Sequence, residues 1–269
     1  RDAGLAHLLA IAGLHIGIVM GLFFGLTRFL LVRWEYAALH WPTKQIAALA
    51  ALAAGGGYML LTGGHVPILR SFAMACLVTL GVLAGRRALS LRGLGLAMAV
   101  VLAVMPEAVM GVSFQMSFAA VLALIAGYDA LRPWLLRVYG DGSRRRRVFA
   151  HLVALALTSA LAGTASAPFG AYHFGHIQVY FIVANLVAVP LTAFWVMPAG
   201  MLALALMPLH LEALALLPMG WGIAAVLWVA RSVAAWPAAV LAAPHMPAWG
   251  LAVLSLGMVW LGVWRSRLR

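Results

Sequence analysis

Residues 178–207 read QVYFIVANLVAVPLTAFWVMPAGMLALALM and contain no charged side chain. An α-helix of this length extends about 45 Å, whereas the hydrocarbon core of a bilayer is roughly 30 Å thick. Similar apolar runs recur along the 269-residue chain, which is 65% hydrophobic and 9% charged and has a mean hydropathy of +1.04. So small a polar fraction cannot cover a soluble domain, which means that the chain uses lipid as its solvent. Because the runs are long and unbroken, they indicate transmembrane helices and not the short alternating strands of a β-barrel.

The whole chain, residues 1–269, is predicted to form one all-α domain, a polytopic bundle of about nine transmembrane helices. At least one helix is expected to be broken, and one segment is expected to be re-entrant or interfacial. The chain starts with Arg1 and Asp2 and without an initiator methionine, so we expect a piece of a longer protein. The predicted spans are residues 5–27, 46–61, 67–84, 94–105, 109–127, 149–166, 178–207, 211–233 and 248–263.

Positive charge alternates from loop to loop. The loops after the first, third, fifth and ninth predicted spans carry arginine or lysine, including four consecutive arginines at 144–147, and those after the second, fourth and sixth carry none. Positive loops stay in the cytoplasm, which predicts an outside N-terminus and a cytoplasmic C-terminus. Arg231, near the outer end of the eighth span, is the exception. The net charge of +12 is therefore interpreted mainly as a topology signal, and the arginine run as a contact for anionic lipid; a basic nucleic-acid surface is the alternative interpretation.

The first predicted span contains His7 and His15. Positions eight residues apart differ by about 80° around a helix, so one polar side could hold both imidazoles. Either these side chains form helix-to-helix hydrogen bonds or they line a hydrated pathway. Glycine also recurs at every fourth position of the span, a pattern that lets another helix backbone approach closely. The glycines predicted to pack in this way are Gly13, Gly17, Gly21 and Gly25.

Two further spans carry polar groups. Arg70 follows Pro67 at the start of the third span, where it either reaches lipid phosphate or contacts a translocating phosphate. Gln115 and Ser117 stand among aromatic residues of the fifth span. The Ser117 hydroxyl is expected to bond to its own helix. Gln115 needs a partner on another helix or in a wet cavity, because an unsatisfied amide in hydrocarbon is costly.

The seventh span contains Asn185, Pro190 and Pro198. Proline cannot donate to the preceding helical turn, and free carbonyls at membrane depth are tolerated only against protein or water. We therefore expect this helix to be broken beside Asn185, with kinking inside a bundle as the alternative. Residues 236–249 contain tryptophans and prolines in a stretch too short to cross, which is the segment expected to be interfacial or re-entrant.

His173 and His176 lie in the outer loop before the seventh span. No carboxylate or cysteine stands near them in the sequence, so no metal site is predicted, and the aromatic residues around them could stack exposed bases. The sequence has no HExxH, P-loop or GxSxG motif and no pair of intramembrane carboxylates. The chain is therefore predicted to have no catalytic residues and no cofactor, and not to be an enzyme.

Five short motifs follow one another along the chain: HLLAIAGLH at 7–15, PILR at 67–70, SFQMS at 113–117, YHFG at 172–175 and ANLVAVP at 184–190. Together they resemble the ComEC family of competence proteins, over residues 5 to about 208. Ala12 stands where the family usually has serine, which puts any role for a hydroxyl in that turn in doubt.

The resemblance implies a channel in the bacterial inner membrane that passes single-stranded DNA into the cytoplasm during natural transformation. It implies single-stranded DNA, membrane lipids, an outer DNA receptor and a cytoplasmic translocation motor as partners, and leaves a homo-oligomer open. Complete family members also carry OB-like and metallo-β-lactamase-like domains, which we expect to be absent from this chain. The residues expected to line the DNA path are His7, His15, Arg70, Gln115, Ser117, His173 and Asn185. Those expected to pack or break helices are Gly13, Gly17, Gly21, Gly25, Pro190 and Pro198.

Two other functions fit the same composition. A transporter of small solutes or lipid-linked substrates would have a closed pocket around the break at Pro190. An intramembrane enzyme would need a nucleophile or a metal partner near His7 and His15.

Overall fold

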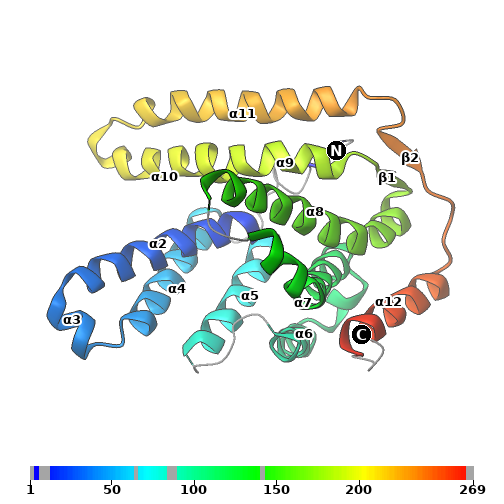
Figure 1. The fold of residues 1–269 in the computed structure, drawn as a ribbon, viewed down its shortest axis with the longest axis horizontal. Helices are drawn as coiled ribbons and strands as arrows, with labels where there is room; N and C mark the ends of the chain where they lie inside the picture. Colours follow the sequence, from blue (N-terminus) through cyan, green and yellow to red (C-terminus); the bar gives the residue numbers. More distant parts are fainter. Residues whose placement is uncertain (1–2, 6–12, 64–65, 84–89, 140–142, 265–269) are drawn as a thin grey trace. The chain divides into compact units, whose positions relative to one another are not determined.

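The computed structural model describes residues 3–5, 13–63, 66–83, 90–139 and 143–264 (Figure 1). Almost all of this part of the chain is helical. The helices are α2 (Gly13–Arg33), α3 (Glu35–His40), α4 (Thr43–Leu61), α5 (Val66–Leu83), α6 (Leu91–Val104), η1 (Pro106–Met110), α7 (Val112–Tyr139), α8 (Arg144–Phe174), α9 (Phe181–Leu191), η2 (Thr192–Val196), α10 (Met197–Leu206), η3 (Met207–Leu209), α11 (Ala213–Ala234) and α12 (Ala248–Val263). The strands are β1 (His176–Gln178) and β2 (Val240–Ala242).

Helix length and apolarity support a multi-pass membrane protein. Within the described residues, six helices are long and apolar enough to cross a bilayer, and the longest candidate spans are Arg145–Phe174 and Phe181–Leu209. The third, fourth and ninth predicted spans correspond to shorter apolar helices, in α5, α6 and α12. The 14 residues of α6 extend only about 21 Å, less than the thickness of the hydrocarbon core. The all-α prediction agrees with this structure except for the two short strands, and the count of nine spans stays a prediction.

The chain divides into two compact units. The N-terminal unit comprises His7–Val104, and the C-terminal unit comprises Met105–Arg269 together with Arg1–Ala6. Ala3 and Leu5 are buried, and Gly4 between them has φ +74° and lies against Phe181 at the start of α9. Residues 3–5 therefore belong to the C-terminal unit, and Leu5, the predicted start of the first span, lies outside the described helices.

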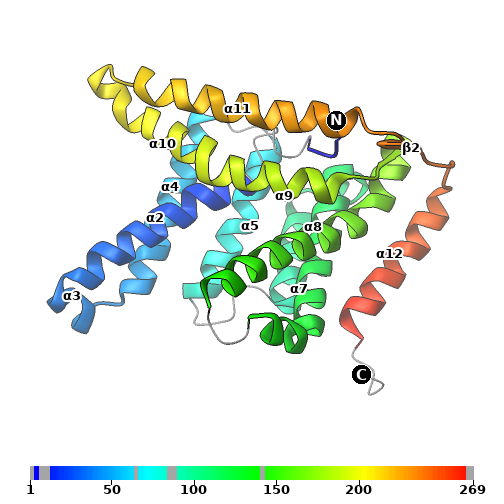
Figure 2. The same ribbon diagram turned by 45° about the horizontal axis from the view of Figure 1, so that its top comes forward.

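In the N-terminal unit, α2 packs along α4, and α5 contacts both (Figures 1 and 2). The core between these helices contains Ile16, Met20, Ala51 and Ile68, all buried. Gly55 of α4 faces Met20 closely, since a Cβ built at Gly55 would lie 2.8 Å from its Cγ. A small residue on α4 therefore makes the close helix approach that was predicted for the glycines of α2.

The α2 glycines make no close helix contact among the described residues, and their packing against another helix stays a prediction. Gly17, Gly21 and Gly25 are exposed, and a Cβ at any of them would meet nothing within 4 Å. Gly13 would meet only the Ser71 hydroxyl, at 3.6 Å, which is an ordinary contact. The larger residues Ile16, Val19 and Met20 occupy the buried face of α2, because the apolar area that they remove from contact with solvent or lipid exceeds that of a glycine face.

This difference predicts opposite results for two glycine-to-leucine changes. Gly55→Leu is expected to lower the stability of the unit by about 1–3 kcal/mol, because an added side chain would overlap Met20 and Phe72. Gly21→Leu is expected to leave the stability unchanged, because its surroundings are open. Thermal unfolding in detergent measures both. A comparable loss in Gly21→Leu would show that the glycine row packs against another helix after all.

In the C-terminal unit, α7 and α8 form a pair joined by a half-buried polar contact. The Tyr128 hydroxyl lies 2.6 Å from the Thr158 hydroxyl and 3.0 Å from the Ala154 carbonyl oxygen. Thr158 also donates to that carbonyl, at 2.8 Å. α12 packs against both helices through Leu251, which lies in a cluster with Ala119 and Phe169.

The seventh span is not broken, contrary to the prediction. α9, η2 and α10 follow one another without interruption and run beside α11 (Figures 1 and 2). η2 is one turn of π-helix, in which the Met197 amide bonds to the Thr192 carbonyl oxygen five residues earlier. The wider turn accommodates Pro198, which has no N–H of its own, and Pro190 lies within α9 before this turn. Trp195 in this turn donates from Nε1 to the Pro218 carbonyl oxygen of α11, at 2.8 Å.

Residues 236–249, predicted to be interfacial or re-entrant, include the short strand β2. β2 pairs antiparallel with β1, with Ile177 opposite Leu241. β1 connects α8 to α9, so β2 lies at the ends of these spans and not between them (Figure 1). The pairing satisfies the backbone groups that the two strands turn toward each other, which reduces the cost of extended chain at a membrane boundary. Trp236 and Trp249 are exposed, which fits the interfacial alternative, and the position of this segment relative to the membrane stays a prediction.

Candidate functional site

Two residues predicted for the DNA path, Gln115 and His173, contact one another. Gln115 lies in the first turn of α7, and His173 is the penultimate residue of α8. Nε2 of His173 is 2.8 Å from the Gln115 amide oxygen. The Gln115 amide nitrogen donates to the Val109 carbonyl oxygen, at 2.9 Å. Gln115 was expected to find a partner on another helix or in a wet cavity, and the structure shows the first of these, with His173 on α8.

Aromatic rings lie beside this pair and along the neighbouring chain at the end of α8 and around β1 and β2. The Tyr172 ring meets His173 edge-on, with centroids 5.0 Å apart and an interplanar angle of 88°. The ring centroid of Phe174 lies 6.1 Å from that of His176, the first residue of β1. Tyr180 meets Trp236 edge-on at 5.1 Å, and its hydroxyl donates to the Pro237 carbonyl oxygen at 3.0 Å. We call this region the aromatic end; it consists of Gln115, Tyr172, His173, Phe174, His176, Tyr180 and Trp236.

The aromatic end is accessible and carries two imidazoles. Phe174 is 56% exposed and Trp236 is 43% exposed. Exposed aromatic faces stack nucleic-acid bases irrespective of sequence, and they also place a protein at the headgroup level of a membrane. Tyr180 and Trp236 were not predicted as site residues. The signal that could have found them is that Tyr180 lies at the predicted outer start of the seventh span and Trp236 begins the predicted interfacial segment, and the pairing of β1 with β2 brings these segments together.

Ser117 lies close to the aromatic end along the chain. It is half-buried on α7, two residues after Gln115. Phe114 and Phe118 on the same helix are buried and in contact, with ring centroids 4.3 Å apart. These rings anchor the start of α7 in the C-terminal unit, which fixes the position from which Gln115 reaches His173.

Asn185 is buried inside the C-terminal unit. It lies on α9, a helix that contacts α8 and α11, between Ala184 and Ala188, which are fully buried. Only 7% of Asn185 is exposed, and its Oδ1 has no hydrogen-bond partner among the described residues. A buried amide oxygen without a donor costs free energy; in the described part of this unit, Glu212 Oε2 is the other buried side-chain atom without a partner. Asn185 forms no hydrogen bond with Gln115 or His173, so the structure does not join it to that pair.

The N-terminal unit holds the other predicted path residues. His15 is half-buried on α2, and its Nδ1 is a buried atom without a hydrogen-bond partner among the described residues. His7 lies outside the described residues, and so does the side chain of Arg70, whose backbone lies in α5. No group of three metal-ligating side chains occurs in the part of the chain that the structure describes.

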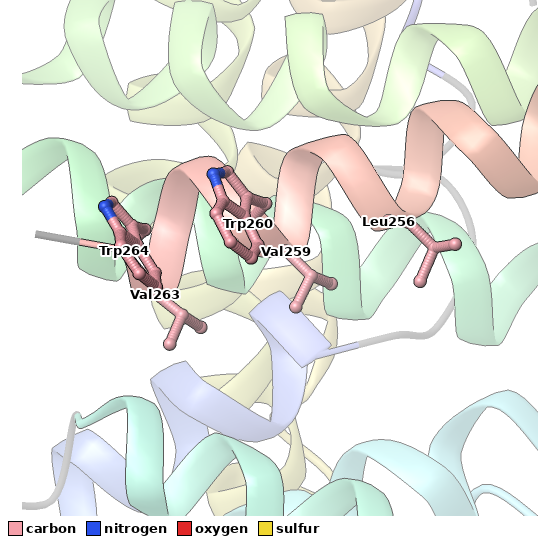
Figure 3. Close-up of a pocket in the computed structure, with 5 residues that line it drawn as sticks. All are labelled: Leu256, Val259, Trp260, Val263 and Trp264. Carbon is pink, nitrogen blue, oxygen red and sulfur yellow. The ribbon is translucent and has the colours of Figure 1, made fainter.

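The C-terminal helix α12 presents an apolar face with a stacked pair of indoles (Figure 3). Trp260 and Trp264 lie 4.5 Å apart with an interplanar angle of 9°, and Leu256, Val259 and Val263 complete the face. All of these side chains come from one helix, so they form a shallow hollow and not an enclosed cavity. Three arginines follow in the sequence, at 265, 267 and 269, a pattern typical of a helix end at a membrane surface.

Comparison with known proteins gives a family match and two relatives. A family model described as Competence protein matches residues 1–268. ComE operon protein 3 of Bacillus subtilis (strain 168) is 29% identical over 210 residues, which cover 77% of this chain and 24% of that protein. The uncharacterized protein YcaI of Escherichia coli (strain K12) is 33% identical over 210 residues, which cover 76% of this chain and 26% of that protein. The matched region is thus about a quarter of each relative. No solved structure matches this chain.

Proposed function

Because this chain belongs to the Competence protein family, we propose that it forms the membrane channel through which single-stranded DNA enters the bacterial cytoplasm during natural transformation. The family match over residues 1–268 carries this proposal. The similarity to ComE operon protein 3 supports a role in competence and DNA uptake. The six long apolar helices fit a polytopic channel.

The proposed channel lies in the inner membrane, with the N-terminus outside and the C-terminus in the cytoplasm. The alternation of positive loops supports this orientation. The pairing of β1 with β2 is consistent with it, because both strands follow spans that would end on the outer side. In this orientation the aromatic end meets incoming DNA, and the proposed partners are an outer DNA receptor there and a translocation motor at the cytoplasmic side.

The chain is proposed to conduct and not to catalyse. A moving strand brings one charge per nucleotide, so the path needs weak, repeated contacts instead of one tight site. Exposed rings and imidazoles of the aromatic end provide contacts of this kind. His15 and Asn185 carry buried polar atoms that would be satisfied by water or by DNA in an open channel.

Single substitutions in the complete parent gene test this function. Arg70→Gln and His15→Leu are each expected to lower transformation by about tenfold or more, equivalent to roughly 1.4 kcal/mol of lost interaction. Protein abundance and DNA bound at the cell surface are expected to stay normal, because the residues act in passage and not in capture. Transformation frequency, immunoblotting and surface-bound labelled DNA are the three measurements.

Arg231→Gln is the matched control, since it removes another arginine predicted near the outer end of a span. It is expected to transform normally, because Arg231 is exposed on α11. Normal transformation in both Arg70→Gln and His15→Leu would refute their assignment to the path. A defect that appeared together with loss of the protein would indicate a role in folding instead.

A further inference from the structure

The hydrogen bonds of Gln115 determine which nitrogen of His173 carries a hydrogen. The Val109 carbonyl oxygen can only accept, so the Gln115 amide nitrogen faces it, at 2.9 Å. The amide oxygen of Gln115 then faces His173, and it also can only accept. Nε2 of His173, 2.8 Å from that oxygen, therefore donates the hydrogen.

The second nitrogen of His173 consequently changes character with protonation. In the neutral imidazole, Nε2 carries the hydrogen and Nδ1 is a bare acceptor; in the cation, Nδ1 carries a hydrogen as well. The bond to Gln115 is the same in both states, so the ring keeps its orientation while Nδ1 changes from acceptor to charged donor. His173 is exposed, which leaves this change available to a ligand.

We propose that Nδ1 of His173 is a contact for the backbone phosphate of a nucleic-acid strand, made when the imidazole is protonated. This inference rests on the proposed function and assigns one phosphate contact within it. A phosphate oxygen only accepts and carries negative charge, so it forms a charge-assisted hydrogen bond with the protonated Nδ1 and is repelled by the lone pair of the neutral form. Tyr172, edge-on at 5.0 Å, places an aromatic ring beside the phosphate contact, where a neighbouring base can stack.

Other ionisable residues lie on the elements around this end of α8. They are Glu107 on η1, Tyr172 on α8, His176 on β1, Tyr180 before α9 and His245 before α12. In the part of the chain that the structure describes, no carboxylate forms an ion pair with His173, so a phosphate would meet an unneutralised cation. His176 also has one nitrogen engaged, since its Nδ1 is 2.8 Å from the Phe174 carbonyl oxygen. An experiment must therefore separate His173 from His176.

Gln115→Glu makes that separation. A carboxylate in place of the amide would favour the charged form of His173, which it contacts, whereas the described residues show no contact between Gln115 and His176. The chain is placed in nanodiscs of uncharged lipid, and its affinity for a fluorescent thymidine oligonucleotide is measured by anisotropy between about pH 5.5 and about pH 8, where imidazoles titrate. Affinity is expected to rise about two- to fivefold as the pH falls, the range for an exposed charge contact. In Gln115→Glu the midpoint of this rise is expected at higher pH.

The controls identify both partners of the contact. In a His173→Gln background, Gln115→Glu is expected to cause no shift of the midpoint. An oligonucleotide with an uncharged methylphosphonate backbone is expected to lose the pH-dependent gain, which distinguishes phosphate from base recognition. His210→Asn removes an exposed histidine between α10 and α11 and is expected to behave as the unmodified chain.

Two results would overturn the inference. One is an unchanged midpoint in Gln115→Glu, provided that this variant elutes and unfolds like the unmodified chain. The other is a pH dependence of binding that is the same for the methylphosphonate oligonucleotide as for the charged one. Either would leave the proposed channel standing as long as the chain binds the charged strand. Absence of binding at every pH would instead count against the proposed function itself.

Discussion

Replacement of Asn185 by leucine is expected to leave the chain folded while DNA uptake falls by about tenfold or more, equivalent to roughly 1.4 kcal/mol. Asn185 is 7% exposed, and its Oδ1 has no donor among the described residues. Burying an unsatisfied polar group costs about 1–3 kcal/mol, so an apolar side chain of similar volume is expected to keep or raise the thermal stability. If the channel uses the Asn185 amide as a contact for DNA, the same substitution removes that contact. The measurements are thermal unfolding of the purified chain and transformation frequency with the parent gene.

Two further variants sharpen this result. Asn185→Asp would place a carboxylate at the same buried position and is expected to lower the unfolding temperature strongly. Val187→Leu alters an exposed position of the same helix and is expected to change neither property. A stable Asn185→Leu variant with normal uptake would remove Asn185 from the proposed path. Loss of stability in that variant would show that the amide makes a structural hydrogen bond.

Gly163→Leu is expected to cause the largest loss of stability in the C-terminal unit. A Cβ built at Gly163 on α8 would overlap the Phe181 ring, with 2.5 Å to Cζ and 2.7 Å to Cδ2. Phe181 begins α9 and also lies against Gly4, so its ring has little room to move away. Overpacking of this kind costs about 1–3 kcal/mol, and a full leucine side chain extends further than the single Cβ. Thermal unfolding in detergent and the yield of monodisperse protein are the measurements.

Gly220→Leu is the matched control on α11. A Cβ at Gly220 would meet nothing within 4 Å, and the residue is exposed. The substitution is expected to leave the unfolding temperature unchanged. If Gly163→Leu unfolded at the same temperature as Gly220→Leu, the close packing of α8 against the start of α9 would be refuted.

The need of Gln115 for a partner could be predicted from the sequence, but not the partner's identity. An amide in an apolar helix must be satisfied whatever the fold, so the need follows from residue type. His173 is 58 positions away, and its contact with Gln115 depends on how α7 and α8 pair. The α2 glycines illustrate the same limit, because GxxxG spacing describes which residues share a face and not which face is buried.

The seventh span shows how a local rule can be overridden. Two prolines in one apolar run predicted a break, because each removes a backbone donor. The structure accommodates Pro198 with the π-turn of η2, in which the Met197 amide bonds to the Thr192 carbonyl oxygen. Trp195 in this turn donates from Nε1 to the Pro218 carbonyl oxygen of α11. This partner lies outside the seventh span, so the sequence of the span could not reveal it. A helix that could kink alone is therefore held continuous by its neighbour.

Composition and hydropathy by themselves determined the environment of this protein and its helical character, because every backbone polar group in hydrocarbon must be satisfied locally and a helix does so within one segment. Motif order likewise indicated the family that the comparison shows. Only the tertiary structure decided which helix faces are buried, that β1 pairs with β2, and that Gln115 holds His173. These features depend on contacts between residues far apart in the chain, and their free energy comes from packing and paired hydrogen bonds that no single segment contains.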